Sequence, residues 1–152
     1  KLLVARTNRG VCSVKFGDAA EELLDGLREE FSRAEISEDD ANLRTTVKAI
    51  IAYLGGKERR LMLPLDLRAT SFQLQVWELL RKIPYGETRS YGEIAEELGD
   101  RKKVRAVARA CATNPVALVI PCHRVVASDG KLSGYRWGID RKEQLLKAES
   151  GK

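Results

Sequence analysis

The sequence has few cysteines and only one histidine. Cys12, Cys111 and Cys122 form an odd, sparse set, and no two of them make a Cys-x-x-Cys pair. Such a set argues against a disulfide framework and favours a reducing, intracellular environment. With one histidine, the chain has too few ligands for a structural zinc site. We therefore expect no metal and no cofactor.

Long hydrophobic runs are also missing. No apolar stretch approaches the roughly 20 residues that a membrane-spanning helix needs, so we expect no membrane partner. The chain has 152 residues, 43% of them hydrophobic. This is enough for one compact domain, or for two small ones that share a core. It starts at Lys1 without a signal-type segment, and we expect it to be trimmed or part of a longer protein.

Charge is distributed unevenly along the chain. The net charge is +5, but residues 18–40 hold ten acidic and two basic residues. Residues 100–142 hold ten basic and three acidic ones. Such asymmetry suggests that the C-terminal half meets a polyanion. The alternative is a basic face that is only solvated.

The first 65 residues are predicted to form a small α/β unit. Alternation over 2–6 and 11–16, around Thr-Asn-Arg-Gly, predicts a β-hairpin. One helix is expected to be capped by Asp18; another is opened by Ser37 and stopped by Gly55-Gly56. Residues 61–63 predict a third short strand. The residues expected to be buried are Leu23, Leu24, Leu27 and Phe31 in the first helix and Val47, Ile50, Ile51 and Leu54 in the second.

The second half is predicted to be mainly helical. Thr70 or Ser71 can cap a helix that ends before the turn at 83–86. Residues 90–98 and 103–112 then predict two short helices joined by Gly99-Asp100-Arg101, which is the helix-turn-helix pattern. A plain helical hairpin is the alternative.

The second of these short helices is basic and rich in alanine. Arg105 and Arg109 are four residues apart and share an outward face. The small apolar residues can face the core; they are Ala106, Val107, Ala110 and Cys111. Few side chains here can read base edges, so the helix favours backbone contact with DNA of any sequence.

The chemical signal lies after an apolar run at 116–120, which is either a short strand or a buried extended segment. There Cys122 stands beside the only histidine, His123, with Arg124 next. A thiolate could be stabilised electrostatically at this point, and His123 can accept the thiol proton directly or through a water. Pro121 must introduce an irregular turn, because adjacent side chains seldom face each other in regular structure. The alternative is an inert buried cysteine, as we expect for Cys12 and Cys111.

These residues resemble the O6-alkylguanine-DNA alkyltransferase family. The matching motifs are Asn114-Pro115, Pro121-Cys122-His123-Arg124-Val125, Gly134-Tyr135 and Lys142-Glu143-x-Leu145-Leu146-x-x-Glu149. The run from Ser133 to Gly138 is most similar to the C-terminal domain of Ada-type bacterial members. The resemblance implies an α+β fold. Residues 1–65 would form a ribonuclease H-like α/β domain, and residues 66–152 a mainly helical, winged helix-turn-helix-like domain that binds DNA and accepts the alkyl group.

The resemblance also implies a reaction. The chain would act as a monomer on double-stranded DNA that contains O6-alkylguanine, and on O4-alkylthymine, in the cytoplasm and at the nucleoid. After base flipping, the alkyl group would pass irreversibly to Cys122, so that each molecule reacts once. His123 matches the water-mediated base, Glu149 the residue that orients it, and Tyr91 the tyrosine that donates to the leaving purine.

Further roles are carried over by position. Arg105 matches the arginine that fills the space left by the flipped base, and Asn114 matches the residue that holds the hinge before the cysteine loop. Arg136 stands where some members have serine. The candidate DNA-binding residues are Arg105, Arg109, Ser90, Ala106 and Thr113. The candidate pocket and hinge residues are Asn114, Val125, Tyr135 and Arg136.

Three rival functions differ in what they require. A non-catalytic sensor of alkylated DNA would keep the fold but replace the reactive cysteine, whereas Cys122 is present. A cysteine hydrolase would need an oxyanion hole, and no glycine-rich donor loop is evident. A plain helix-turn-helix regulator explains the basic helix but leaves the cysteine loop without a purpose.

Overall fold

The computed structural model describes residues 1–151 and divides them into two compact units. The first unit is formed by residues 1–67 together with 115–117. The second is formed by residues 68–114 and the chain from 118 onward. Strands and helices occur in both units, and the expected α+β fold class is confirmed. No helix within residues 1–151 is long and apolar enough to cross a membrane.

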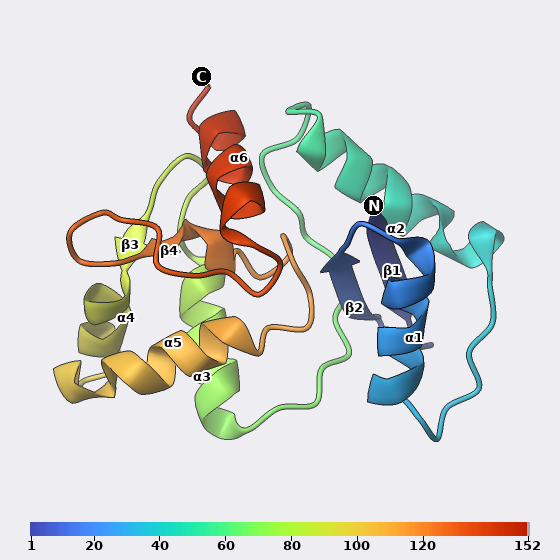
Figure 1. The fold of residues 1–152 in the computed structure, drawn as a ribbon, viewed down its shortest axis with the longest axis horizontal. Helices are drawn as coiled ribbons and strands as arrows, with labels where there is room; N and C mark the ends of the chain where they lie inside the picture. Colours follow the sequence, from blue (N-terminus) through green and yellow to red (C-terminus); the bar gives the residue numbers. More distant parts are fainter. Residues whose placement is uncertain (152) are drawn as a thin grey trace. The chain divides into compact units, whose positions relative to one another are not determined.

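The first unit is built on the predicted hairpin. Strand β1 (Leu2–Arg6) pairs antiparallel with β2 (Val11–Phe16) (Figure 1). The segment 115–117 adds to β2, because the Val14 amide donates to the Pro115 carbonyl at 3.0 Å and the Ala117 amide donates to the Val14 carbonyl at 2.9 Å. A β-carbon at Gly10 would lie 2.6 Å from the Pro64 oxygen, so only glycine fits this close approach.

The predicted third strand is wrong. Residues 61–63 form no strand, and Met62 is 76% exposed. The pairing falls later instead, at an isolated bridge between Val11 and Leu65. The Pro64 carbonyl accepts from the Val11 amide at 2.8 Å. The chain therefore first contacts β2 at Pro64 and Leu65, after the apolar residues 61–63.

The two helices of this unit exist, but their predicted caps are wrong. Helix α1 (Ala20–Glu30) begins after Ala19 with no side-chain cap, so Asp18 is not a cap. Helix α2 (Asp40–Leu54) is capped by Asp39, which accepts from the Asn42 amide at 3.2 Å, and not by Ser37. The acidic run contains several side chains that could cap the helix, and Asp39, directly before the first turn, is the one that does. Helix α2 ends at Gly55, as predicted.

The buried faces of these helices agree only in part with the sequence pattern. In α1, Leu23 and Leu27 are buried as expected. In α2, the buried residues are Thr46, Ile50 and Tyr53, whereas Ile51 is 61% exposed. Leu54 is exposed as well. The helix therefore turns its tyrosine inward in preference to two of its aliphatic side chains.

The second unit contains the remaining helices. Helix α3 (Ser71–Arg81) begins at Thr70, which forms a capping box with Gln73. Strand β3 (Arg89–Ser90) leads into α4 (Tyr91–Glu97), and a 3₁₀ turn η1 (Arg101–Lys103) leads into α5 (Val104–Ala112). A second 3₁₀ turn, η2 (Cys122–Arg124), precedes β4 (Val125–Val126) and α6 (Ile139–Glu149). Strands β3 and β4 pair in parallel, so the start of α4 is fixed next to the cysteine turn.

Aliphatic side chains and one tryptophan form the core of this unit. Trp77 is 3% exposed and donates from its ring nitrogen to the Ala110 carbonyl at 2.8 Å, which joins α3 to α5. The run 116–120 is buried, and only residues 118–120 belong to this unit; apart from one bridge at Val116, in the first unit, the run forms no strand. Leu118 adopts a φ of 71°, which bends the run toward Pro121.

Candidate functional site: a cysteine turn beside a basic helix

The predicted helix-turn-helix is formed by α4, η1 and α5. Ser90 caps α4 by accepting from the Glu93 amide at 3.0 Å, and Asp100 caps η1 through the Lys102 amide at 2.9 Å. Val107 is fully buried against the unit's core, while Arg105 is exposed. The two helices and the turn between them thus present one face of α5 to solvent.

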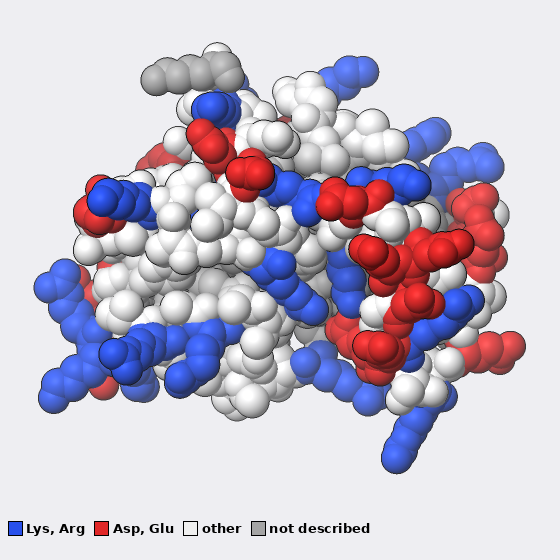
Figure 2. Space-filling view, in the orientation of Figure 1, with Lys and Arg blue, Asp and Glu red and all other residues white. Residues whose placement is uncertain are grey.

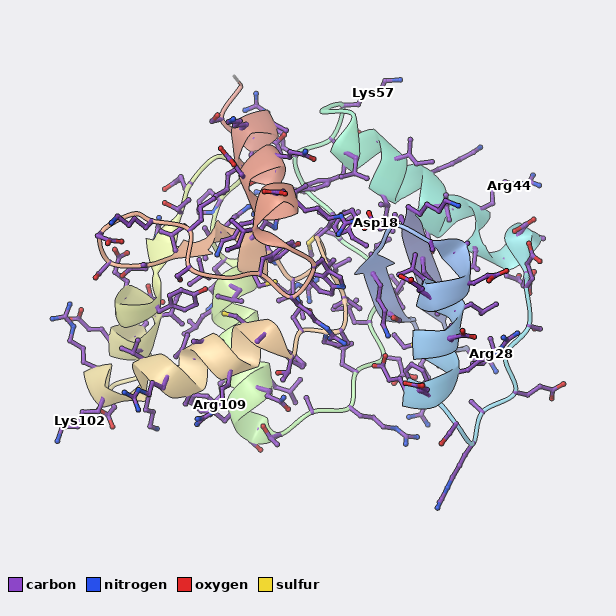
Figure 3. The ribbon with its side chains drawn as sticks, in the orientation of Figure 1. Asp18, Arg28, Arg44, Lys57, Lys102 and Arg109 are labelled. Carbon is purple, nitrogen blue, oxygen red and sulfur yellow. The ribbon has the colours of Figure 1, made fainter. Side chains whose placement is uncertain are left out.

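Basic side chains gather on that exposed face. Figure 2 shows a concentration of Lys and Arg around η1 and α5, and Figure 3 shows Lys102 and Arg109 directed outward there. Ala106 is half-buried between this face and the core. Thr113 is exposed, but its hydroxyl accepts from the Gln73 amide at 3.0 Å and lies 3.0 Å from the Arg109 carbonyl. Of the candidate DNA-binding residues, Arg105, Arg109 and Thr113 are thus exposed on α5 or at its end, whereas Ser90 is half-buried at the cap of α4.

Two residues counted with this basic half do not belong to the surface. Arg124 is 6% exposed and Lys142 is fully buried. Both charged groups bind buried partners inside the second unit, which are described below. The part of the polyanion argument that rested on them is wrong, because burial cannot be read from composition.

The cysteine lies in a tight turn, as Pro121 predicts. The Cys122 amide donates to the Ile120 carbonyl at 2.8 Å, and the Arg124 amide donates to the Pro121 carbonyl at 2.9 Å. Asn114, which is fully buried, donates from its side-chain nitrogen to the Ile120 carbonyl at 2.8 Å and to the Cys122 sulfur at 3.2 Å. One amide thus holds both the turn and the sulfur at the end of α5.

Burial decides the ionisation of Cys122. It raises the pKa of the thiol to about 11, although the Asn114 hydrogen bond and the charges of Lys142 and Arg136 act in the opposite direction. The resting side chain is therefore a thiol near neutral pH. A nucleophilic thiolate has to be formed by transferring the proton to a neighbouring base.

His123 has the properties of such a base. It is fully buried, and burial lowers its pKa below the ordinary 6.5, so the ring is neutral near pH 7. Its Nε2 lies 2.8 Å from Oε1 of Glu149. A carboxylate can only accept, so Nε2 carries the ring proton and Nδ1 keeps its lone pair. Within residues 1–151, Nδ1 is buried without a hydrogen-bond partner.

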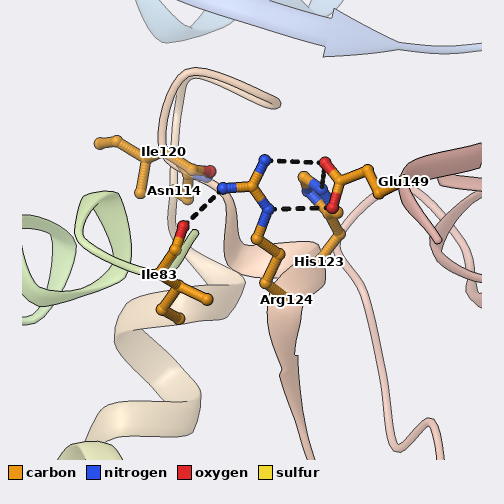
Figure 4. A network of polar contacts seen from close by, with 6 residues as sticks. All are labelled: Ile83, Asn114, Ile120, His123, Arg124 and Glu149. Carbon is orange, nitrogen blue, oxygen red and sulfur yellow. Dashed lines mark hydrogen bonds and ion pairs between the residues drawn. The ribbon is translucent and has the colours of Figure 1, made fainter. Parts of the chain in front are cut away.

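Arg124 lies elsewhere than expected. The sequence suggested that it stabilises a Cys122 thiolate, but its guanidinium binds Glu149 through Nε at 2.9 Å and Nη2 at 2.8 Å (Figure 4). Its third nitrogen donates to the Ile83 carbonyl at 2.7 Å. The prediction from sequence position was wrong because successive side chains of a 3₁₀ turn point in different directions. Arg124, two residues after Cys122, therefore faces away from the sulfur.

Lys142 is the residue whose importance the sequence reasoning missed. Its ammonium donates to the Val125 carbonyl at 2.6 Å and to the Gly134 carbonyl at 2.9 Å, joining β4, which directly follows the cysteine turn, to the next loop. Burial lowers its pKa, while the nearby Cys122 raises it. The sequence feature that could have indicated its burial is its spacing from Glu149. The two residues are seven apart and therefore lie on the same face of α6.

The candidate pocket residues surround this turn. Val125 is fully buried, and the Tyr135 ring meets the His123 ring edge to face at 6.5 Å. Tyr91 lies at the start of α4, where burial raises its pKa and keeps its hydroxyl protonated. The Lys142 ammonium is 5.8 Å from the centre of its ring. The Tyr91 hydroxyl, a proton donor, and the buried Cys122 thiol therefore both lie near Lys142 in the second unit.

Arg136 contacts the hinge. Its guanidinium donates to the Asn114 carbonyl at 2.7 Å and lies 5.4 Å from the centre of the Trp137 ring. Trp137 itself is buried. Arg136 thus ties the loop after β4 to the end of α5.

Family models match almost the whole chain. Residues 1–67 match the ribonuclease-like domain of 6-O-methylguanine DNA methyltransferase, and residues 71–151 match its DNA binding domain.

Individual relatives agree with these matches. The chain is 49% identical to the bifunctional transcriptional activator and DNA repair enzyme Ada of Escherichia coli, over 99% of this chain but 42% of that protein. The chain thus spans less than half of that relative. It is 48% identical to a methylated-DNA–protein-cysteine methyltransferase of Mycolicibacterium paratuberculosis, over 78% of this chain and 72% of that one. The Mycobacterium tuberculosis OGT structure in complex with DNA superposes with a TM-score of 0.85 at 38% identity, covering 99% of this chain and 86% of that chain.

Proposed function

Because the chain belongs to the 6-O-methylguanine DNA methyltransferase family, we propose that it repairs DNA by moving the alkyl group of O6-alkylguanine onto Cys122. The observation that carries the proposal is the position of this thiol. It is held by Asn114 in the turn that also contains His123, a neutral base oriented by Glu149. The exposed basic helix α5 supplies the surface for double-stranded DNA.

The chemistry is a single displacement. With the damaged guanine flipped out of the duplex, the thiol proton passes to Nδ1 of His123, directly or through a water. The Cys122 sulfur attacks the alkyl carbon, the bond from that carbon to O6 breaks, and the electron pair stays with guanine. Tyr91 is placed to donate a proton to the leaving purine.

The product is a thioether, which has no hydrolysis route, so each molecule reacts once. O4-alkylthymine would present the same kind of alkyl carbon. We propose that the chain acts as a monomer, since one copy supplies the thiol, the base and the basic helix. It would work in the cytoplasm, at the nucleoid when bound to DNA.

The test is the mass of the intact chain after incubation with a duplex that contains O6-methylguanine. We expect a gain of one methylene on one molecule of protein per lesion, abolished by Cys122→Ser and retained in Cys111→Ser. Cys111 is a matched control because it is also buried, with a pKa raised by burial to about 12. Tight binding without a mass change would favour a damage sensor, and repeated turnover would exclude the single-use reaction.

A further inference from the structure

Each of the three guanidinium nitrogens of Arg124 binds a group other than the reactive sulfur. It forms a two-point ion pair with Glu149, and its remaining nitrogen binds the Ile83 carbonyl. The guanidinium carbon lies 5.6 Å from the centre of the Tyr85 ring. The side chains of Arg124 and Glu149 are 7% and 3% exposed. A buried guanidinium held by three hydrogen bonds is fixed in position, and so is the carboxylate that it holds.

Glu149 needs such a partner to remain charged. It is the last residue of α6, where the negative end of the helix dipole disfavours a carboxylate, and it is buried. A buried carboxylate without a cation takes up a proton instead. Arginine supplies a charge that persists at every accessible pH. The ion pair therefore sets the protonation state of the group that His123 faces.

Other charged groups near this pair are differently engaged. Lys142 lies on the cysteine side, bound to two carbonyl oxygens, and its charge disfavours a protonated His123. Glu143 and Lys147 line a shallow hollow with Glu149, but they pair with each other at 3.3 Å at the surface. Neither of these arrangements supplies Glu149 with the two hydrogen bonds that Arg124 provides.

We propose that Arg124 is a positioning residue for alkyl transfer, which keeps Glu149 ionised and thereby holds His123 in the tautomer with a free Nδ1. If Glu149 were protonated, it could donate to Nε2, and the ring proton would move to Nδ1. That nitrogen could then no longer accept the proton of the Cys122 thiol. The inference rests on the proposed function only for its kinetic consequence; the tautomer itself needs no substrate.

The test uses the fact that the chain has a single histidine. With ¹⁵N-histidine labelling, the ring nitrogen shifts report one imidazole and give its tautomer directly. We expect the Nε2–H form in the wild type and in Arg28→Met, a control that removes an exposed arginine paired with Asp25 at 3.7 Å. In Arg124→Met we expect a mixture or the Nδ1–H form near pH 7. Circular dichroism checks that each variant is folded.

Arg124→Lys keeps the charge but loses the two-point geometry. We expect it to retain the Nε2–H form at pH 7 and to lose it, on acidification, at a higher pH than the wild type. Should Arg124→Met fail to fold, this shift decides the matter. An unchanged tautomer in Arg124→Met, or an unchanged acid transition in Arg124→Lys, would overturn the inference.

The kinetic readout is the rate of reaction with free O6-benzylguanine, which needs no DNA contact. We expect a loss of roughly 10- to 100-fold in Arg124→Met at pH 7, with most of the rate restored in Arg124→Lys. A merely structural role would lower the melting temperature without changing the tautomer or the pH profile. If the wild type gains no alkyl group at all, the proposed function fails while the tautomer result stands.

Discussion

The side-chain amide of Asn114 donates to the sulfur of Cys122 at 3.2 Å. The same nitrogen holds the Ile120 carbonyl, so the end of α5 and the cysteine turn share one donor. Because this donor favours the ionised sulfur, it lowers the cost of forming a thiolate in a buried place.

We expect Asn114→Ala to lower the free energy of unfolding by about 1–3 kcal/mol, because the Ile120 carbonyl loses its partner. We also expect it to slow the reaction with free O6-benzylguanine. Asn114→Asp should slow the reaction further, since a carboxylate next to the sulfur repels a thiolate. Urea unfolding and the change in intact mass with time measure the two effects. Asn42→Ala, in the exposed first turn of α2, is the control; equal losses there would contradict a specific role for Asn114.

Lys142 joins β4, directly after the cysteine turn, to the loop that follows it, and its loss should affect stability and reactivity together. In Lys142→Met, the carbonyls of Val125 and Gly134 lose their donor, and Cys122 loses a nearby positive charge. We expect the thiol pKa to rise above about 11 and the alkylation rate at pH 7 to fall. Thiol titration by ultraviolet absorbance, in a background without the other two cysteines, measures the first effect.

Lys147→Met is the matched control for that variant. Lys147 lies on the same helix, 67% exposed, and pairs with Glu143. Exposed pairs of this kind contribute little to stability. A loss of rate in Lys147→Met as large as that in Lys142→Met would show that any charge on α6 matters, and not the buried one.

The pH dependence of the reaction should separate the base from the nucleophile. Burial lowers the pKa of His123 below 6.5, so the neutral base persists as the pH falls past that value. We expect the rate with free O6-benzylguanine to hold through pH 6.5 and to fall only at lower pH. In His123→Ala the rate should instead follow the thiolate fraction, rising roughly tenfold per pH unit until about pH 11. A flat profile in His123→Ala would contradict the role of His123 as proton acceptor.

The sequence predicts those features that depend on local chemistry. Alternation and a turn with Gly10 predict the hairpin, and Thr70 with Gln73 predicts the start of α3. The proximity of Cys122 to His123 follows from their adjacency and Pro121. Features that depend on packing are not predictable in this way. The acidic run before α2 contains several equivalent caps, and only the fold selects Asp39.

Buried charges are the clearest failure of prediction from sequence. Arg124 and Lys142 look like parts of a basic surface, because nothing local distinguishes them from exposed cations. Their partners, Glu149 and the carbonyls of Val125 and Gly134, are brought close only when α6 packs against the cysteine turn. Sequence spacing places Lys142 and Glu149 on one face of a helix, but it does not say what that face meets.

Arg105 tests whether the exposed face of α5 serves DNA and not the chemistry. The side chain is exposed at the start of α5, whereas Cys122 is buried in the same unit. We expect Arg105→Ala to slow repair of O6-methylguanine in duplex DNA far more than the reaction with free O6-benzylguanine. The reason is that a small free base needs no help in leaving a base stack, whereas a paired guanine does.

The comparison variant is Arg109→Ala, four residues further along the same face. If Arg109 contacts only phosphates, its loss should weaken binding to damaged and undamaged duplexes alike and reduce the salt dependence of binding. Arg105→Ala should instead weaken the preference for the damaged duplex. Binding measured at several salt concentrations, together with single-turnover repair rates, separates the two effects. If Arg105→Ala slowed the reaction with duplex DNA and with free O6-benzylguanine equally, Arg105 would contribute to the folding of the unit and not to base flipping. The flipped base would then be held by the pocket alone.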